Sequence, residues 1–345
     1  MYRIIEPAPD QWDMFVRQHP RAHVLQLSAW GALKRAYGWQ VGRVALTPDD
    51  SSQLVAGAQV LYRPLSKLGS MAYIPMGPLV TQDDQWTPLW NALRKRAAQR
   101  KAAFLKWEPG LYLDETPPDF SRWGFVESPQ TVQPPRTILI DVRGDDETIL
   151  ARMNQGTRRK IRKSLKSGIH YYEGKHADVS TFTAMMQATG TRNEFGVHEP
   201  GYYHKAFDLF APSGEAVLLM AEHEGDVLAG IMVFAVGKMA WYLYGASSNE
   251  KRNLMATYGV QWQAIEWARA RGCHYYDLWG VPDADAAALE AQFQERSDGL
   301  WGVYGFKRGW GGQIVRSAGA WDKVYNPLVY NIYKVALRAL GHGVE

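Results

Sequence analysis

The sequence predicts an α/β (α+β) fold of two tandem domains, because the chain is too long for one core and one succession of elements occurs twice. A single core seldom grows beyond roughly 250 to 300 residues, and this chain has 345. Two stretches about 170 residues apart resemble each other: QLVAGAQVLYRPL with MAYIPMGPLV, and GDVLAGIMVFAVG with MAWYLYGASS. We interpret them as an internal duplication whose two halves enclose a cleft. Chance recurrence of a common succession is the alternative.

Each half is predicted to contain two adjacent strands, a crossover helix and a further strand, which together form a mixed sheet. In the first half the strands cover residues 53–65, 71–80 and 104–109, with the helix near 86–103. In the second half the strands cover residues 225–237, 239–248 and 273–280, with the helix near 257–272. An apolar stripe at spacings of three and four residues, ended by a charge, indicates the second helix: Met255, Tyr258, Trp262, Ile265 and Arg269.

The passage between the halves is predicted at residues 132–141, because Pro134 and Pro135 lie near its start. The end of the chain, from Trp321 onward, predicts one more helix that begins near Pro327. It follows both halves, so we expect it to return to the first one. We therefore place domain 1 at residues 1–141 plus 319–345 and domain 2 at residues 142–318.

Composition and missing motifs exclude several classes of protein. Cys273 is the single cysteine, which excludes a disulfide framework and favours a reducing compartment. There is no apolar signal region and no run of 18 apolar residues, so we expect a cytoplasmic location. Nucleophile-elbow, zincin, Walker and Rossmann motifs are absent, and the nine histidines do not cluster. We expect neither a metal nor a cofactor.

The helix-like segment from Ala151 to Ile169 carries seven basic residues and no acid: Arg152, Arg158, Arg159, Lys160, Arg162, Lys163 and Lys166. Five of them, at 158, 159, 162, 163 and 166, fall within about 140° of one another on a helix. Ile161 and Leu165 are predicted to point the other way. A net charge of only +4 means that an anionic partner must be met by such a local patch. The face is either a solvated surface or a binding surface for RNA phosphates or an anionic membrane.

The segment LWGVYGFKRGWGG places Lys307 and Arg308 among glycines and aromatic residues. Glycine lets backbone approach a ligand closely, and aromatic neighbours lower the local dielectric. Lys307 is therefore a candidate for a strong local positive charge, with a surface lysine in a turn as the alternative. The acidic, alanine-rich residues 281–299 before it are expected to form a mobile loop over a site.

Two further cations are weaker candidates. Arg192 lies in TGTRNEFGVHEPGYY, where it could bind phosphate bidentately or hold the loop through Glu194 or Glu199. Lys34 ends SAWGALK, on a short predicted helix that contains Trp30.

Taken together, these motifs resemble the FemABX family of non-ribosomal peptidyl transferases, which extend peptidoglycan stem peptides using aminoacyl-tRNA. The resemblance covers nearly the whole chain, through SAWGALK, YIPMGPLV, FLKWEP, RRKIRKSLKSGI, TGTRNEF, WYLYGASS, YYDLWG, GVYGFKRGWGG and NPLVYNIY. It implies two GNAT-like domains, of which the first binds the precursor and is closed by the C-terminal helix. The second would be catalytic and face tRNA. No long charged heptad insertion is present, so we expect the compact FemX type without a coiled-coil arm.

The resemblance also implies roles for single residues. Lys34 and Arg192 would bind the diphosphate of the cell-wall precursor, and Glu108, Thr189 and Tyr203 would line the same groove. Tyr244 would lie beside the reaction centre, and Phe306 with Lys307 matches the family's Phe-Lys pair. The tRNA would meet Arg158, Arg159, Arg162, Lys163 and Lys166. One departure is that the usual Pro-Arg-Gly-Pro reads Pro-Met-Gly-Pro here, with Met76 in place of the cation.

The predicted function is transfer of an amino acid from aminoacyl-tRNA to the stem-peptide amine of UDP-MurNAc-pentapeptide or lipid II. Lys307 would stabilise the oxyanion that forms when the amine attacks the ester, and the general base is left open. A lipid-linked acceptor would bring transient contact with the inner face of the membrane, and no stable protein partner is implied. The rivals are an acyl-CoA N-acyltransferase of the same fold and a noncatalytic binder of anionic glycan precursors or RNA. Asn249 to Met255, in place of a glycine-rich pyrophosphate cradle, disfavours acyl-CoA.

Overall fold

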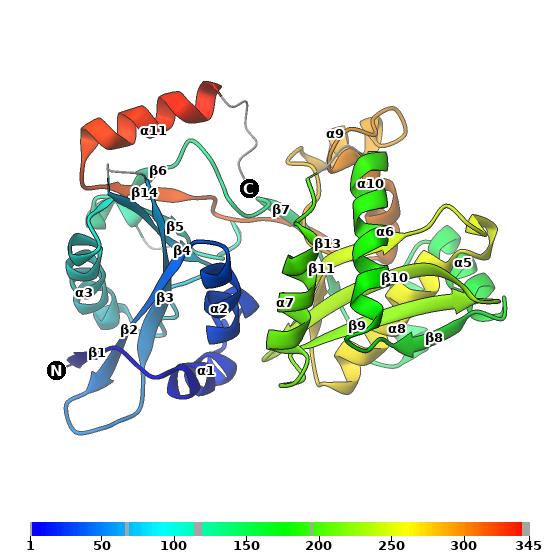
Figure 1. The fold of residues 1–345 in the computed structure, drawn as a ribbon, viewed down its shortest axis with the longest axis horizontal. Helices are drawn as coiled ribbons and strands as arrows, with labels where there is room; N and C mark the ends of the chain where they lie inside the picture. Colours follow the sequence, from blue (N-terminus) through cyan, green and yellow to red (C-terminus); the bar gives the residue numbers. More distant parts are fainter. Residues whose placement is uncertain (1, 66–68, 114–118, 194–195, 340–345) are drawn as a thin grey trace. The chain divides into compact units, whose positions relative to one another are not determined.

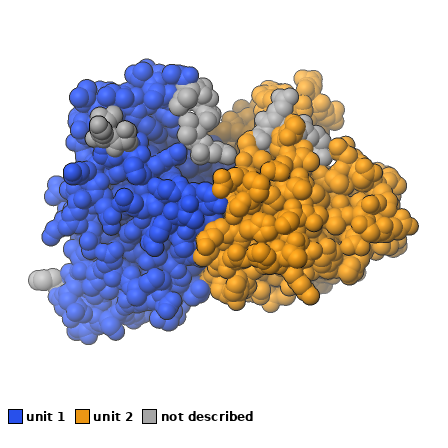
Figure 2. Space-filling model, viewed as in Figure 1, with its two compact units in different colours: residues 1–135, 316–345 blue, residues 136–315 orange. Residues whose placement is uncertain are grey.

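A computed structural model describes residues 2–65, 69–113, 119–193 and 196–339 of the chain. The chain divides into two compact units, residues 1–135 with 316–345 and residues 136–315 (Figure 2). Each unit contains its own seven-stranded sheet. The predicted domain boundaries at 141/142 and 318/319, and the roles given to the domains, stay predictions.

Unit 1 is a mixed sheet with strand order β1-β2-β3-β4-β5-β14-β6. Its strands are β1 (Tyr2–Ile5), β2 (Gln40–Pro48), β3 (Ala56–Pro64), β4 (Ser70–Pro75), β5 (Ala102–Glu108), β6 (Val126–Glu127) and β14 (Trp321–Val324). Its helices are α1 (Pro9–Gln18), α2 (Ser28–Ala36), α3 (Trp86–Gln99) and α11 (Pro327–Ala339), with short 3₁₀ turns at Val24–Gln26, Asp83–Gln85 and Phe120–Trp123. The neighbours β4 and β5 are parallel and are joined by α3, as a crossover helix requires.

Unit 2 repeats this plan, with strand order β13-β7-β12-β11-β10-β9-β8 (Figure 1). Its strands are β7 (Arg136–Asp141), β8 (His170–Glu173), β9 (Ala216–His223), β10 (Asp226–Val236), β11 (Met239–Ser247), β12 (Tyr275–Asp277) and β13 (Gln313–Arg316). Its helices are α4 (Asp146–Arg152), α5 (Gln155–Leu165), α6 (Asp178–Asn193), α7 (Pro200–Phe210), α8 (Ala256–Ala270), α9 (Ala286–Gln292) and α10 (Trp301–Lys307), with 3₁₀ turns at Arg252–Leu254 and Arg308–Trp310. The parallel pair is β11 and β12, joined by α8.

Helices cover both faces of the unit 2 sheet, because its central strands are apolar on both sides. Ile231 and Val233 of β10 belong to the core that α8 closes, together with Trp262 and Ile265 of that helix. Phe234 points to the other face, where its ring packs edge-on against Phe210 of α7, 5.1 Å between centroids. Helices α6 and α7 lie over this second face of the sheet (Figure 1).

Three segments can be compared with the sequence predictions: residues 136–141, residues 281–299 and the end of the chain. Residues 136–141, part of the predicted passage between the halves, form β7, because Ile138 and Ile140 are buried in the unit 2 core and β7 pairs with β12. Residues 281–299 are not only a loop: they contain α9, which Asp285 caps and Leu289 anchors in the core. The end of the chain does return, since β14 pairs with β5 and α11 packs Tyr330 on Phe104.

Candidate active site

Lys307 ends α10, where its side chain is buried although it carries an ammonium group. The residue is 7% exposed, and Trp301 and Tyr304 of the same helix are also buried. Its Nζ donates a hydrogen bond to the carbonyl oxygen of Gly280, at 2.7 Å, and lies 5.7 Å from the centre of the Tyr242 ring. An ammonium is rarely buried unless polar or charged groups compensate for its lost hydration.

The parallel strands β11 and β12 explain where this lysine sits. They pair over only three residues and separate after Trp241 and Asp277, while β11 goes on pairing with β10 as far as Ser247. Tyr242 lies on β11 just beyond the last pair, and Gly280 lies just beyond β12. Lys307 therefore lies where the two strands part, beside Tyr242 of β11 and the turn that follows β12.

The electrostatics around Lys307 are those of a cation in a low-dielectric site. Burial lowers the pKa of Lys307 to about 8, and the Asp277 carboxylate opposes that shift. Burial raises the pKa of Asp277 to about 6, against hydrogen bonds from Thr137 and Trp279 and the charge of Lys307. Near neutral pH both groups are charged, so this site presents a fixed ammonium with little water around it.

Phe306 faces the neighbouring helices. Its ring packs edge-on against Tyr258 of α8, with centroids 5.0 Å apart, and against Trp310 at 5.7 Å. The Tyr258 hydroxyl accepts a hydrogen bond from Lys160 of α5, at 3.0 Å. Phe306 thus packs α10 against α8, and Lys307, the next residue, places its ammonium beside Gly280.

Two glycines after Lys307 let separate segments of the chain approach each other closely. The predicted approach of backbone to a ligand stays a prediction. In the structure Gly309 lies against Thr157 and Asn154, and its carbonyl accepts a hydrogen bond from the Asn154 backbone, at 3.1 Å. Gly311, at φ +73°, lies against the carbonyl of Arg152. These glycines let the chain after α10 pack on the α4–α5 junction.

Thr189, Tyr203 and Tyr244 are brought together on the α6/α7 face of the sheet. The rings of Tyr203 and Tyr244 pack edge-on at 5.3 Å, and the Tyr244 hydroxyl lies 3.4 Å from that of Tyr202. Thr189 Oγ1 accepts a hydrogen bond from the backbone of Ser247, at 3.3 Å. Arg192 belongs to the last turn of α6, but its side chain lies outside the described residues.

A bulge separates Tyr244 from the lysine. The register between β10 and β11 pairs Met232 with Tyr244 but Val233 with Tyr242, and so skips Leu243. Tyr242 then points into the α8 core beside Lys307, whereas Tyr244 points to the α6/α7 face. The roles predicted for Tyr244, Thr189 and Tyr203 stay predictions.

Glu108 ends β5 of unit 1 and is buried in a hydrogen-bond network. Its carboxylate accepts from the Tyr73 hydroxyl, from the backbone N–H of Val132 at 2.6 Å and from that of Gln133 at 3.0 Å. Burial raises the pKa of Glu108, against the lowering effect of these hydrogen bonds. Glu108 therefore fixes the backbone of the segment that leaves unit 1. Its predicted role in the groove stays a prediction.

Lys34 is half-buried on α2, with its ammonium 4.8 Å from the centre of the Trp30 ring. Its carbonyl accepts a hydrogen bond from Trp39, whose ring packs on Tyr73, the partner of Glu108. Helix α2, Tyr73 and Glu108 are thus linked within unit 1. Diphosphate binding by Lys34 stays a prediction.

The loop that holds Met76 is fixed by a buried amide. Gln26 Nε2 donates to the carbonyl of Pro75, at 2.6 Å, and lies against Gly77. The Trp107 indole donates to the Gly77 carbonyl. Met76 therefore lies in a loop whose backbone is held on both sides, by Gln26 and by Trp107.

The basic segment forms α5, capped by Asn154, whose side chain accepts from the N–H of Thr157 at 2.7 Å. Ile161 is buried as predicted, but Leu165 is 44% exposed, so its predicted inward direction was wrong. The reason is that the buried stripe runs through Thr157, Ile161 and Ser164, which centres it away from Leu165.

The five predicted cations of α5 divide into two kinds. Arg158 is half-buried and donates to the carbonyl of Met153, at 2.8 Å, so it caps the end of α4. The other four cations are exposed and form no ion pair among the described residues: Arg159, Arg162, Lys163 and Lys166. These four form the face available to an anionic partner.

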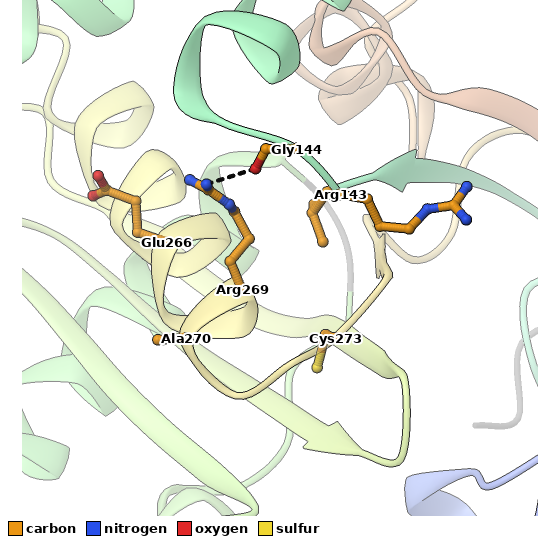
Figure 3. Close-up of a pocket in the computed structure, with 7 residues that line it drawn as sticks. Arg143, Gly144, Glu266, Arg269, Ala270 and Cys273 are labelled. Atoms are coloured by element: carbon orange, nitrogen blue, oxygen red, sulfur yellow. Dashed lines mark hydrogen bonds between the residues drawn. The ribbon is translucent and has the colours of Figure 1, made fainter.

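A hollow of about 570 Å³ lies elsewhere in unit 2, and Figure 3 shows its lining, with Arg269 and Glu266 on α8. Its arginines are already paired: Arg269 with Asp146 and the Gly144 carbonyl, and Arg143 with Asp141 at 2.7 Å. None of the predicted site residues lines it. Because its charges are internally neutralised, we assign it no ligand.

Sequence reasoning missed Gly280, which accepts from Lys307, Asp277, whose charge acts on Lys307, and Thr137, which donates to Asp277. The internal repeat contained a signal for one of them, since Asp277 occupies in YYDLWG the place that Glu108 occupies in FLKWEP. Nothing in the sequence marks Gly280, because it acts through its backbone carbonyl.

Metal binding and membrane spanning have no support among the described residues. No group of three histidine, cysteine, aspartate or glutamate side chains in this part of the chain is placed to hold a metal ion. No described helix is long and apolar enough to cross a membrane. The longest helix among these residues, α6, has 16 residues, too few for a coiled-coil arm.

The two mixed sheets share one strand order, and a buried lysine lies where the parallel strands of the second sheet separate. This architecture is that of a tandem GNAT-like protein. The model of the FemAB family matches residues 8–119, 124–226 and 220–338. The chain therefore belongs to the FemAB family, as the sequence motifs predicted.

Relatives and solved structures agree over almost the full chain. The lipid II:glycine glycyltransferase of Staphylococcus saprophyticus subsp. saprophyticus is 26% identical over 397 residues, covering 93% of this chain and 92% of the relative. That of Staphylococcus aureus is 24% identical over 402 residues, with the same coverage. A crystal structure of FemX is similar with a TM-score of 0.87 at 22% identity, over 96% of this chain and 99% of that one. A tandem GNAT protein from the clavulanic acid pathway has a TM-score of 0.56 at 11% identity, over 95% and 99%. These likenesses confirm the predicted fold.

Proposed function

We propose that this chain transfers an amino acid from aminoacyl-tRNA to the stem-peptide amine of a lipid-linked peptidoglycan precursor. The coarser part of this statement, an aminoacyltransferase of peptidoglycan bridge formation, rests on family membership and on the glycyltransferase relatives that span the chain. The observation that carries the finer part is the buried ammonium of Lys307, held at Gly280 where β11 and β12 part.

The chemistry needs an electrophilic group more than a nucleophilic residue. The neutral acceptor amine attacks the ester carbonyl of the aminoacyl-tRNA, a C–N bond forms, and the carbonyl oxygen takes the negative charge. The C–O bond to the tRNA ribose then breaks, and the departing ribose oxygen leaves as a hydroxyl with the proton that the amine gives up. Lys307 stabilises the oxyanion, a role for which one good donor is typically worth about 10² to 10³ in rate.

The Lys307 ammonium has N–H groups available to donate to the oxyanion. An ammonium carries three N–H groups, and within the described residues the Gly280 carbonyl is its one hydrogen-bond acceptor. In a buried site the interaction with a developing anion is stronger than in water. Lys34, Arg192, Glu108, Thr189 and Tyr203 are proposed to bind the precursor, and Tyr244 and Phe306 to frame the reaction centre.

The face made of Arg159, Arg162, Lys163 and Lys166 is proposed to bind the tRNA phosphates, with Arg158 holding the helix in place through α4. The face is exposed, carries no acid on α5, and is linked to α10 through Lys160, Tyr258 and Phe306. A cationic helix of this kind neutralises phosphates in a salt-dependent manner.

Helix α11 favours a lipid-linked acceptor over a nucleotide-linked one. Its inner face packs on β5, but its outer face exposes three aliphatic side chains, Leu328 at 72%, Ile332 at 47% and Val335 at 64%. Lys334 and Arg338 flank this stripe, and Pro327–Ala339 contains no acid. A helix with an exposed apolar stripe and basic flanks fits an anionic membrane surface. We therefore propose transient binding at the cytoplasmic face of the membrane.

The acyl-CoA alternative is disfavoured by the start of α8, where an enzyme of that type would bind pyrophosphate. Here Tyr258 is covered by Lys160, the Met255 carbonyl accepts from Ser164 at 2.8 Å, and Gly259 lies against Tyr171. The first turn of α8 is thus occupied by the chain's own α5 and β8. Protection of the protein against heat by acetyl-CoA, without any response to aminoacyl-tRNA, would favour this alternative.

The test is a transfer assay with mixed charged tRNA and both forms of precursor, read as the mass increment on the acceptor. The increment identifies the amino acid and the number of residues added. Lys307→Met should lower transfer about 10² to 10³-fold, whereas Lys175→Met, at an exposed lysine of the same unit, should leave it unchanged. A folded Lys307→Met protein with full activity would refute the assignment. Precursor binding without transfer would favour the noncatalytic alternative.

A further inference from the structure

The turn that follows β12 holds a strained residue next to Lys307. Trp279 has a φ of +61°, a left-handed conformation that is costly for a side chain of its size. Such a conformation persists where surrounding contacts determine it, and often where function needs it. The turn runs from Asp277 to Gly280, so its shape decides where the Gly280 carbonyl points.

Two buried side chains, those of Asp277 and Thr137, hold this turn. Asp277 Oδ1 accepts a hydrogen bond from the backbone N–H of Trp279, at 2.7 Å. The Thr137 hydroxyl donates to the same carboxylate oxygen and lies 3.0 Å from the Trp279 carbonyl. The left-handed residue is therefore held at its N–H by Asp277, and its carbonyl lies beside the Thr137 hydroxyl.

This turn also positions the ammonium, because the Gly280 carbonyl accepts from Lys307 Nζ at 2.7 Å. The titratable groups on the elements packed around Lys307 are neutral or paired, apart from Asp277. Tyr242 of β11 is neutral up to a pKa of about 12, raised by burial, and Tyr276 of β12 carries no charge near neutral pH since burial raises its pKa as well. Arg308, next in the chain, is paired with Glu290 of α9. Asp277 is the carboxylate that acts on Lys307.

We propose that Asp277 and Thr137 are positioning residues for the transfer reaction, which fix the Trp279 turn so that Gly280 orients the Lys307 ammonium. The Asp277 carboxylate, buried at the start of the same turn, is also the negative charge that favours the protonated form of Lys307. The inference rests on the proposed function for its catalytic part. Its structural and electrostatic part concerns Lys307 alone and is measurable without any substrate.

The first experiment replaces the charge and keeps the shape. In Asp277→Asn the amide oxygen still accepts from Trp279, but the negative charge is gone. Loss of an opposite charge lowers the pKa of an ammonium. NMR titration of labelled lysine side chains, with the Lys307 resonance assigned by its absence from Lys307→Met, should show the pKa of Lys307 falling below about 8. The alkaline limb of the transfer rate should move to lower pH by the same amount.

The second experiment removes the hydroxyl and keeps the charge. Thr137→Val should lower kcat about 10- to 100-fold, as expected for a misplaced catalytic group, with KM unchanged. The alkaline limb of the pH profile should stay in place, because Asp277 keeps its charge there, while the pKa of Asp277 itself should rise, because the Thr137 hydrogen bond lowers it. Thr137→Ser should restore the rate. Thr183→Val is the matched control, because Thr183 is also buried in unit 2 and its hydroxyl has no partner among the described residues.

The outcomes separate the two proposals. An unchanged pKa of Lys307 in folded Asp277→Asn overturns the electrostatic role, and Thr137→Val that behaves like Thr183→Val overturns the positioning role. The wild type could show no transfer while the pKa of Lys307 still falls in Asp277→Asn. In that case the proposed function fails, but the effect of Asp277 on Lys307 stands. Should Asp277→Asn not fold, Thr137→Val and Thr137→Ser decide the inference.

Discussion

Glu108 and Asp277 show how single residues serve related purposes in the two units. Each is a buried acid at the end of the strand that follows a crossover helix. Each accepts hydrogen bonds from a hydroxyl and from backbone N–H groups: Glu108 from Tyr73 and Val132, Asp277 from Thr137 and Trp279. A buried carboxylate in this position shapes the chain that leaves the sheet.

Replacement of Glu108 should reveal this structural use. Glu108→Ala leaves the N–H groups of half-buried Val132 and Gln133 without their acceptor. The loss of such hydrogen bonds, together with the desolvated groups left behind, costs about 1–3 kcal/mol. We expect denaturant unfolding at neutral pH to show a loss of this size. Exposed Glu127→Ala in the same unit should be nearly neutral.

The raised pKa of Glu108 determines how its contribution to stability changes with pH. Because burial raises its pKa above the ordinary value of 4.5, the folded state binds the proton more tightly than the unfolded state does. Its contribution to stability is therefore greatest at low pH and declines as pH rises from 4.5 through the raised pKa. In Glu108→Gln, which cannot ionise, this decline should be absent. A wild-type profile parallel to that of Glu108→Gln would show that Glu108 does not titrate in this range.

At the level of residues, the sequence predicted Lys307 but not its setting. Glycines and aromatic neighbours marked GVYGFKRGWGG as unusual, and the lysine is indeed buried. Gly280 and Asp277, which act on it, lie 27 and 30 positions earlier in the chain and come near it only after β12 and α10 have packed. Local sequence cannot report a contact of this separation.

Helix α5 shows what periodicity predicts about an element. The 100° step between residues correctly separated the exposed cations from Ile161. It misplaced Leu165, because the buried stripe is completed by Ser164, which donates to the Met255 carbonyl beside α8. A small polar residue can occupy a core-facing position when a neighbouring segment satisfies it.

The exposed face of α5 should determine the salt dependence of tRNA binding. Replacing Arg159, Arg162, Lys163 and Lys166 by Gln should reduce the slope of log K against log salt by about 0.7 to 0.9 for each phosphate that is no longer neutralised. Filter binding or fluorescence anisotropy across salt concentrations measures the slope. Lys175→Gln with Lys205→Gln, at exposed lysines outside α5, is the control. An unchanged slope would leave this face as solvated surface.

Helix α11 should be the element that meets the membrane. Burial of an exposed aliphatic side chain is worth about 1.5–3 kcal/mol, so Leu328→Ser with Val335→Ser should weaken binding to anionic vesicles about tenfold or more. Sedimentation with vesicles of phosphatidylglycerol measures the binding. Met14→Ser, at another exposed apolar side chain of unit 1, is the control. Equal binding of the double variant and the control would remove α11 as the docking helix.

At the scale of the whole molecule, unit 1 is completed by the end of the chain. Strand β14 inserts beside β5 and brings Asp322 to Lys106, with 3.2 Å between Nζ and Oδ1 and both side chains fully buried. Asp322 also accepts from Ser128 and Tyr330, at 2.7 and 2.8 Å. A buried ion pair of this kind ties the last strand to the first part of the chain.

Loss of that pair should destabilise unit 1 strongly. Asp322→Ala leaves the Lys106 ammonium buried without its counter-charge, which costs about 3–5 kcal/mol. Asp83→Ala breaks the pair of Asp83 with Arg122, where the aspartate is 81% exposed, and should cost less than about 1 kcal/mol. Unfolding free energies of the two variants measure the contrast. Equal costs would mean that Lys106 is satisfied by Ser128 and Gln130 without Asp322.

By itself the sequence determined the repeated succession of elements, the two mixed sheets and the family, because hydrophobic periodicity and turn residues act over short stretches and short motifs recur in order. The tertiary structure alone decided that β7 and β14 complete the two sheets and that a bulge at Leu243 turns Tyr242 toward Lys307 and Tyr244 away. It also decided that Asp277 and Thr137 hold a left-handed Trp279. These features depend on contacts between segments far apart in the chain, whose energies exist only when the sheet has formed.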